Sequence, residues 1–274
     1  MSVPPRMRRP ARAGTAPVDV LLLHGMGGGV NGWDPLDPLL DDRFRLWDVP
    51  LPWSPTGDVR WAFERDVTGW VADAVDAAER AAGNRIGLVV AHSFAANVLL
   101  ELAEREGPRW RRPTVLVSPF YRPDPAAFEW TAIAEYADGF RRMLDEGLRL
   151  RAGTRISDET RTDMAIRLRD LMGPYTWLRF FDTFLRTALL RPARLEAPVL
   201  VIGGADDAGA RAQGLLDLAA ALPAARVEIL AGCGHFPMIE RPDRLAGAIN
   251  DFATTAAAAH RPAPASHHLQ ETPI

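Results

Sequence analysis

Lysine is absent from this sequence of 274 residues, and cysteine occurs once. The single thiol, Cys233, excludes an intramolecular disulfide framework and a cysteine-rich zinc module. No run of 18 or more apolar residues occurs, so we expect no membrane-spanning helix and no membrane partner. The net charge of -3 lacks the basic excess typical of nucleic-acid binders, so no nucleic acid is expected as a partner. A reducing cytosol suits a chain with one thiol, and we expect a cytoplasmic protein.

Apolar residues make up 47% of the sequence, enough for a sizeable core at this length. They gather in short continuous runs that alternate with helix-like segments, and such runs are typical of strands buried on both faces. This alternation predicts an α/β fold with a mostly parallel central sheet flanked by helices. The predicted strands span 18–23, 44–49, 86–91, 114–117, 199–203 and 227–230, and the predicted helices span 61–82, 95–106, 210–222 and 242–258.

One long segment interrupts the alternation. Residues 121–195 mix arginine, aromatic residues and helical periodicity, which predicts a helical lid inserted between two parts of the core, 18–120 and 196–258. The apolar face of this lid either packs on the main domain or covers a substrate pocket. The basic, proline-rich residues 1–17 are interpreted as a disordered arm, and residues 259–274 as a disordered tail.

The lid is rich in arginine between Arg141 and Arg169. These side chains could attract an acidic substrate, such as a carboxylate or the surface of a carrier protein. The interspersed aspartate and glutamate residues favour the simpler interpretation of a solvated helix face.

A serine stands where a predicted strand gives way to a predicted helix, within Ala91-His92-Ser93-Phe94-Ala95. At such a corner a sharp turn lifts the serine hydroxyl above the sheet, an arrangement called the nucleophile elbow. The flanking positions must be small, and alanine stands at both places where glycine is usual. On this motif alone, Ser93 is as well explained as an N-cap of the following helix.

The first predicted strand ends in His24-Gly25 and a glycine-rich turn. A loop at this place supplies one of two backbone N–H groups that stabilise an oxyanion, and the residue after the nucleophile supplies the other. The candidates are the amides of Met26 and Phe94. The turn does not match the patterns of phosphate-binding glycine loops.

Acid and base candidates follow two later predicted strands. Asp206 and Asp207 end one strand, and His235 stands in a Gly-rich turn after the next. The carboxyl ends of parallel strands meet at one edge of a sheet, so Ser93, one aspartate and His235 are expected to converge there.

With these four motifs in this order, the sequence resembles the α/β-hydrolase superfamily. The similarity is to its small lidded members, which include esterases, enol-lactone hydrolases, proline iminopeptidases and cofactor-free haloperoxidases. It covers residues 18–120 and 197–252 and implies the α/β-hydrolase fold with a catalytic triad of Ser93, Asp207 and His235. Counting from Gly204 favours Asp207 as the acid, and counting from Gly203 leaves Asp206 as the alternative.

The resemblance implies a serine hydrolase that cleaves an ester, lactone or thioester of a small hydrophobic or aromatic acyl substrate through an acyl-enzyme. It implies no metal and no organic cofactor. Trp33, Phe120 and Trp177 are candidate pocket residues. The substrate is expected to be a small molecule, with a carrier-protein-bound thioester as a second form, and the protein to be a monomer or homodimer.

Two alternatives stay open. In the first, the same triad serves a cyclase or acyl transferase of secondary metabolism, in which a substrate hydroxyl or amine replaces water. In the second, the chain is a non-catalytic ligand-binding protein on a hydrolase scaffold, because fold alone does not fix function.

Overall fold

The computed structural model describes residues 4–14 and 16–259. Within these ranges seven strands form one sheet in the order β1-β3-β2-β4-β5-β6-β7. Strand β1 is antiparallel to β3, and all other neighbouring pairs are parallel, which confirms the mostly parallel sheet. The strands are β1 Arg6–Arg9, β2 Val18–Leu23, β3 Phe44–Asp48, β4 Leu88–His92, β5 Thr114–Val117, β6 Val199–Gly204 and β7 Ala225–Leu230.

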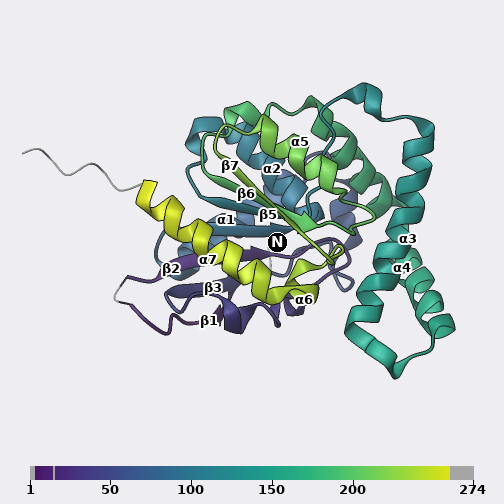
Figure 1. Cartoon of the computed structure of the whole chain (residues 1–274), viewed down its shortest axis with the longest axis horizontal. Coiled ribbons are helices and arrows are strands. Elements are labelled where there is room, and N and C mark those ends of the chain that lie inside the picture. Colours follow the sequence, from purple (N-terminus) through teal and green to yellow (C-terminus); the bar gives the residue numbers. More distant parts are fainter. Residues whose placement is uncertain (1–3, 15, 260–274) are drawn as a thin grey trace, which may run out of the picture.

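Helices cover both faces of this sheet (Figure 1). Helices α1, α2 and α5 bury their apolar side chains in one core cluster, and α6 and α7 bury theirs in a second cluster on the opposite face. The predicted helices over 95–106, 210–222 and 242–258 agree with α2, α5 and α7 to within two residues. These helices are α1 Thr68–Ala82, α2 Phe94–Glu106, α5 Ala212–Ala221, α6 Pro237–Glu240 and α7 Pro242–Ala259.

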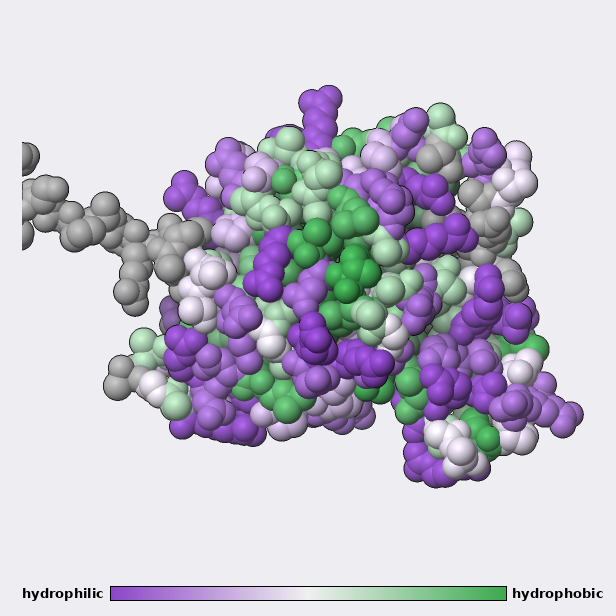
Figure 2. All heavy atoms as spheres, viewed as in Figure 1, coloured by the Kyte–Doolittle hydropathy of each residue, from purple (hydrophilic) through white to green (hydrophobic). Residues whose placement is uncertain are grey.

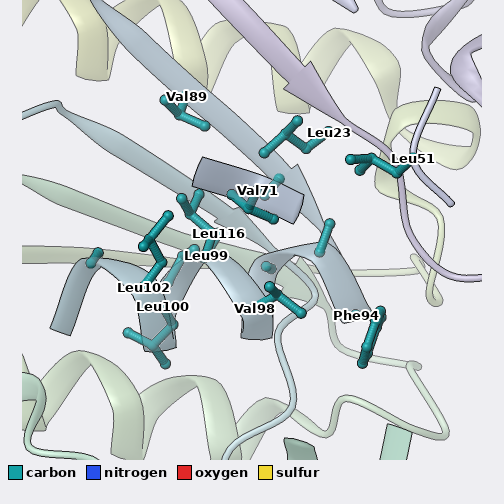
Figure 3. Packing of buried hydrophobic residues seen from close by; sticks show 14 of the residues in the cluster. Leu23, Leu51, Val71, Val89, Phe94, Val98, Leu99, Leu100, Leu102 and Leu116 are labelled. Carbon is teal, nitrogen blue, oxygen red and sulfur yellow. The ribbon is translucent and has the colours of Figure 1, made fainter. Parts of the chain in front are cut away.

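Strand β4 shows why the apolar runs are continuous. All of its residues are buried, and they alternate between the two core clusters. Val89 packs with Leu99 and Leu116 on the α2 side (Figure 3), whereas Leu88 and Val90 pack on the α7 side. A strand that is buried on both faces needs apolar residues at successive positions.

The interpretation of residues 1–17 as a disordered arm is wrong for Arg6–Arg9, which form β1 on the edge of the sheet. Arg6 Nη2 lies 2.9 Å from Asp48 Oδ2, and Arg8 Nε lies 2.9 Å from Asp37 Oδ2. These ion pairs join residues that are far apart in the sequence, so a basic segment without an apolar run becomes an ordered strand. The rest of the predicted tail, residues 260–274, lies outside the described residues.

The helix predicted over 61–82 begins only at Thr68, and a 3₁₀ turn, Val59–Phe63, precedes it. Asp66 Oδ1 accepts hydrogen bonds from the amide of Thr68 at 2.9 Å and from its hydroxyl at 2.5 Å. An aspartate that bonds the backbone two residues ahead forms a turn that competes with helix. The break therefore falls just before Thr68.

Two long helices, α3 Trp130–Ala152 and α4 Asp158–Arg186, occupy the segment expected to form a lid. They lie beside the sheet in Figure 1, and in Figure 2 hydrophilic residues cover much of their visible surface. Gly173, with φ 72°, interrupts α4 just before Pro174. Among the described residues, no helix is long and apolar enough to cross a membrane.

Candidate active site

Ser93 stands at the corner between β4 and α2 with φ 55° and ψ -123°. Residues other than glycine rarely adopt this backbone conformation, and it persists only where the surrounding structure enforces it. The side chain makes no capping hydrogen bond to α2, so the N-cap interpretation does not describe it. Ala91 and Ala95, on either side, are completely buried. Alanine is therefore small enough for this elbow.

His235 bridges Ser93 and Asp207. Its Nε2 lies 3.0 Å from Ser93 Oγ, and its Nδ1 lies 2.7 Å from Asp207 Oδ2. All three side chains are buried. The carboxylate accepts a hydrogen bond from Nδ1–H, which leaves Nε2 as an acceptor that faces the serine hydroxyl. The structure thus brings together three residues from the ends of three strands.

The second oxygen of Asp207 is also held. Asp207 Oδ1 accepts hydrogen bonds from the amides of Gly209 and Ala210, at 2.9 and 3.0 Å. Asp206 is exposed, and its backbone N–H bonds the carbonyl of Cys233 at 2.9 Å. Of the two adjacent carboxylates, the structure places Asp207 against His235.

The candidate oxyanion donors are the amides of Met26 and Phe94. Phe94 directly follows Ser93 in the chain, and the loop of Met26 lies next to Ser93 in space. Phe94 is the first residue of α2, and Met26 follows Gly25, where an added Cβ would lie 3.0 Å from Ser93 Cβ and 2.8 Å from His92 Nδ1. Within the described residues, no acceptor takes either amide N–H. Both remain available to a substrate oxygen.

His24 fixes the loop that carries Met26. Its Nε2 accepts a hydrogen bond from the amide of Leu51 at 2.9 Å, and its Nδ1 donates to the carbonyl of Gly25 at 2.9 Å. Burial lowers the pKa of His24 to about 4, so the imidazole is neutral near pH 7. Trp53 Nε1 donates to the carbonyl of His24 at 3.0 Å.

His92 is a site residue that the sequence analysis did not identify. Its Nε2 donates a hydrogen bond to the carbonyl of His235 at 2.9 Å. Burial, together with the nearby His235, lowers the pKa of His92 well below the usual value. A neutral imidazole therefore positions the backbone of His235. Its place directly before Ser93 was the signal that could have pointed to it.

The candidate pocket residues are not equivalent. Trp33 lines a pocket beside the loop of His24 to Gly29. The ring of Phe120 lies 5.6 Å from the ring of His235. Trp177 contacts Phe140 at 4.2 Å, and Phe140 stacks on Phe120 at 5.9 Å. Trp177 thus joins the aromatic cluster through Phe140, and its role as a pocket residue stays a prediction.

Helix α3 crosses the carboxyl edge of the sheet on one face. Gly139, Met143, Gly147 and Arg151 are four residues apart and so share that face. Added Cβ atoms would lie 3.4 Å from the carbonyl of Ala208 at Gly139, and 3.0 Å from the Phe236 ring at Gly147. The two glycines let α3 approach the loops that carry Asp207 and His235.

Two other groups bear on the chemistry of the site. Burial raises the pKa of the Cys233 thiol to about 12, so the thiol stays protonated and is a weak nucleophile. Among the described residues, no group of three or more His, Cys, Asp or Glu side chains could hold a metal ion.

A parallel sheet that carries Ser, Asp and His at its carboxyl edge, in this chain order, defines the α/β-hydrolase class. The family model of the alpha/beta hydrolase family matches residues 20–248. The chain therefore belongs to the alpha/beta hydrolase family. No curated protein sequence matches the chain.

Several solved structures are similar to this chain. A thermophilic esterase from Thermogutta terrifontis is 20% identical, with a TM-score of 0.60 over 88% of this chain and 91% of the esterase. The 2-hydroxy-6-oxo-6-phenylhexa-2,4-dienoate hydrolase of Rhodococcus sp. strain RHA1 is 20% identical, with a TM-score of 0.59 over 86% and 90%. A bacterial membrane phospholipase A is 19% identical, with a TM-score of 0.65 over 89% and 81%. At these identities the likeness concerns the fold.

Proposed function

We propose that this protein is a serine hydrolase that cleaves an ester, lactone or thioester of a small hydrophobic or aromatic acyl group. The observation that carries the proposal is the chain of contacts from Ser93 Oγ through His235 to Asp207, at 3.0 and 2.7 Å. A serine hydroxyl is a weak nucleophile near neutral pH unless an adjacent base takes its proton. This geometry meets that requirement.

In the proposed reaction, Ser93 Oγ attacks the acyl carbon while His235 Nε2 takes the hydroxyl proton. Asp207 holds the tautomer and stabilises the imidazolium. The free amides of Met26 and Phe94 donate to the oxyanion. His235 then protonates the leaving group, the acyl-enzyme forms, and water activated by the same histidine releases the acid. These steps draw only on groups of the chain and on water.

The surroundings of Ser93 support an apolar acyl group. Phe94, Phe120 and Phe180 lie in the same buried cluster. The ring centroid of Phe180 lies 6.3 Å from that of Phe94 and 4.9 Å from that of Phe120. Such clusters favour apolar and aromatic groups over strongly hydrated ones.

Turnover of a panel of aryl esters, lactones and thioesters tests the proposal. Wild type is expected to hydrolyse members of the panel with short or aromatic acyl groups, and Ser93→Ala is expected to reduce turnover to background. Circular dichroism and thermal melting of the variant confirm that it is folded. Turnover that survives in Ser93→Ala contradicts the proposal, and a folded wild type that binds panel members without turnover favours the ligand-binding alternative.

One observation favours acyl transfer or cyclisation as a second candidate. Ser93 is only 7% exposed, under a lid whose inner face is largely apolar, so water has restricted access to an acyl-enzyme. Reaction in H₂¹⁸O separates the two fates by mass spectrometry. Incorporation of ¹⁸O into the acid product supports hydrolysis, whereas a product without added water supports transfer or cyclisation.

A further inference from the structure

Arg151 ends the face of α3 that crosses the carboxyl edge of the sheet. It lines the same pocket as Met26, Trp33 and the glycine loop, together with Met143 and Gly147. Its Nη2 would lie 3.9 Å from a Cβ at Gly32. Arg151 is exposed, so its charge lies at the mouth of the pocket, beside the loop that carries the Met26 amide.

Two other arginines of the lid are paired with carboxylates. Arg149 pairs with Glu146 at 2.5 Å, and Arg161 pairs with Asp145 at 2.9 Å. Their carboxylate partners raise the pKa values of both arginines. The Arg149 pair lies within α3, whereas the Arg161 pair joins α4 to α3.

Arg151 is different. Within the described part of the chain, no oxygen accepts a hydrogen bond from its guanidinium and no carboxylate forms an ion pair with it. Burial lowers the pKa of Arg151, and no carboxylate offsets that effect. A guanidinium at the mouth of a pocket, without a carboxylate partner of its own, is free to form a charge-assisted hydrogen bond with an anionic ligand.

A second donor in this pocket also lacks a partner. Trp33 is 1% exposed, and its Nε1 has no hydrogen-bond partner among the described residues. No aspartate or glutamate lines the pocket. Asp34 lines the adjoining cleft with Arg151, but it pairs with Arg8. The pocket therefore has an unpaired cation at its mouth and a buried, unpaired N–H on one of its lining residues, and no aspartate or glutamate lines it.

We propose that Arg151, with Trp33 Nε1, binds a carboxylate of the substrate, so that the preferred substrates are esters, lactones or thioesters that carry a free carboxylate. The expected substrate preference rests on the proposed function, because it requires turnover. Binding of an anion by Arg151 can be measured without turnover. The carboxylate lies in the acyl group or in the leaving group, and the chemistry of recognition is the same in both.

Two pairs of esters separate these sources. In the first pair, 4-nitrophenyl monoadipate carries the carboxylate in the acyl group and 4-nitrophenyl hexanoate is its neutral match. In the second, 4-carboxyphenyl hexanoate carries it in the leaving group and 4-carbamoylphenyl hexanoate is neutral. We expect kcat/KM of wild type to favour the anionic member of one pair by about 10- to 100-fold, the range of a charge-assisted hydrogen bond.

Arg151→Gln is expected to remove this preference, mainly by raising KM, and to leave turnover of the neutral esters within about twofold. The matched control is Arg167→Gln, at an exposed position of the same lid, which should keep the full preference. The absence of a preference in both pairs overturns the inference, and so does a preference that survives in Arg151→Gln.

Calorimetric binding of 4-nitrophenyl monoadipate to Ser93→Ala separates this inference from the proposed function. Adding Arg151→Gln to Ser93→Ala should raise Kd by about 10- to 100-fold, with no change for 4-nitrophenyl hexanoate. If the double variant binds more weakly in this way but wild type hydrolyses none of the esters, the proposed function is refuted and the role of Arg151 is kept. An equal Kd in the single and double variants would refute the role of Arg151 whether or not esters are hydrolysed.

Discussion

The carboxyl edge of the sheet and the lid are stabilised in different ways. At the edge, the backbone of three strands fixes Ser93, Asp207 and His235, and all three side chains are buried. In the lid, Arg161 of α4 forms ion pairs with Asp145 of α3 and with Asp158 of its own helix, and apolar residues of both helices pack into the core cluster. The position of Ser93, Asp207 and His235 thus depends on backbone geometry, whereas the proposed recognition of a carboxylate depends on a few side chains of α3.

The two regions meet along one face of α3. There Gly139 and Gly147 allow close approach, and Met143 and Arg151 reach the loops beneath. A change at the edge should therefore affect the reaction strongly. A change on the outer surface of the lid should have little effect on the reaction or on stability.

The largest expected effect is on kcat, and it should distinguish the two neighbouring carboxylates Asp206 and Asp207. Asp207→Asn should lower kcat by about 10⁴-fold, because the amide no longer holds the histidine in the required tautomer. Asp206→Asn, its matched control, should keep kcat within about twofold, since Asp206 is exposed and does not bond His235. Steady-state turnover of the best ester of the panel measures both. A larger loss in Asp206→Asn would move the acid to Asp206.

The second effect concerns the loop of the oxyanion amides. Gly25→Ala places a Cβ 2.8 Å from His92 Nδ1 and 3.0 Å from Ser93 Cβ, which must displace the Met26 amide. Loss of one oxyanion donor typically lowers kcat by about 100- to 1000-fold, and that loss is expected here. Gly29→Ala has nothing within 4 Å of its added Cβ and should keep kcat. Similar kcat values for the two variants would rule out this role of the loop.

The third effect is on stability. Burial sets the pKa of His24 at about 4 in the folded state, against 6.5 for an ordinary histidine. The unfolded chain therefore binds more protons between these values, and the stability that neutral His24 contributes is present above pH 6.5 and lost as the pH falls towards 4. Between pH 7 and pH 5 this loss is about 2 kcal/mol in the free energy of unfolding. His92, buried with a lowered pKa, acts in the same direction.

Urea unfolding at pH 7, 6 and 5 measures the loss. His24→Gln keeps a polar side chain that does not titrate. Between pH 7 and pH 5, its free energy of unfolding should fall by about 2 kcal/mol less than that of wild type. A pH dependence equal to that of wild type would show that His24 is protonated in the folded protein.

The smallest effect belongs to the lid. Arg161→Ala removes the ion pairs with Asp145 on α3 and Asp158 on α4, and partly exposed pairs typically contribute about 0.5–1 kcal/mol. The free energy of unfolding should fall by that amount, while kcat of the best ester stays within about twofold. A loss of kcat comparable to that of Gly25→Ala would mean that the lid surface and the edge are not independent.

The sequence predicts the edge better than the lid. Continuous apolar runs identified six strands, and small residues around Ser93 identified the elbow, because both depend on local backbone geometry. The acid and base followed from the ends of two further strands. The choice of Asp207 over Asp206 required distances, since both aspartates follow the same strand.

Features that depend on contacts between distant segments were not predictable in this way. Strand β1 pairs with β3, and Arg6 and Arg8 of this strand form ion pairs with Asp48 and Asp37. No local pattern of the sequence contains these contacts. Helical spacing placed Trp177 on an apolar face, but it could not show that Trp177 contacts Phe140 and that Phe140 stacks on Phe120. The unpaired state of Arg151 depends on how α3 and α4 pair their other arginines.

The most direct test of the account is covalent labelling of Ser93 with a fluorophosphonate, read as intact mass and mapped by peptide mass spectrometry. The account predicts one adduct on wild type, located at Ser93, that Ser93→Ala and His235→Ala both abolish. Cys233→Ser should label like wild type, since the buried thiol is protonated. A folded wild type without an adduct, or an adduct that His235→Ala retains at the wild-type rate, would contradict the claim that His235 activates Ser93.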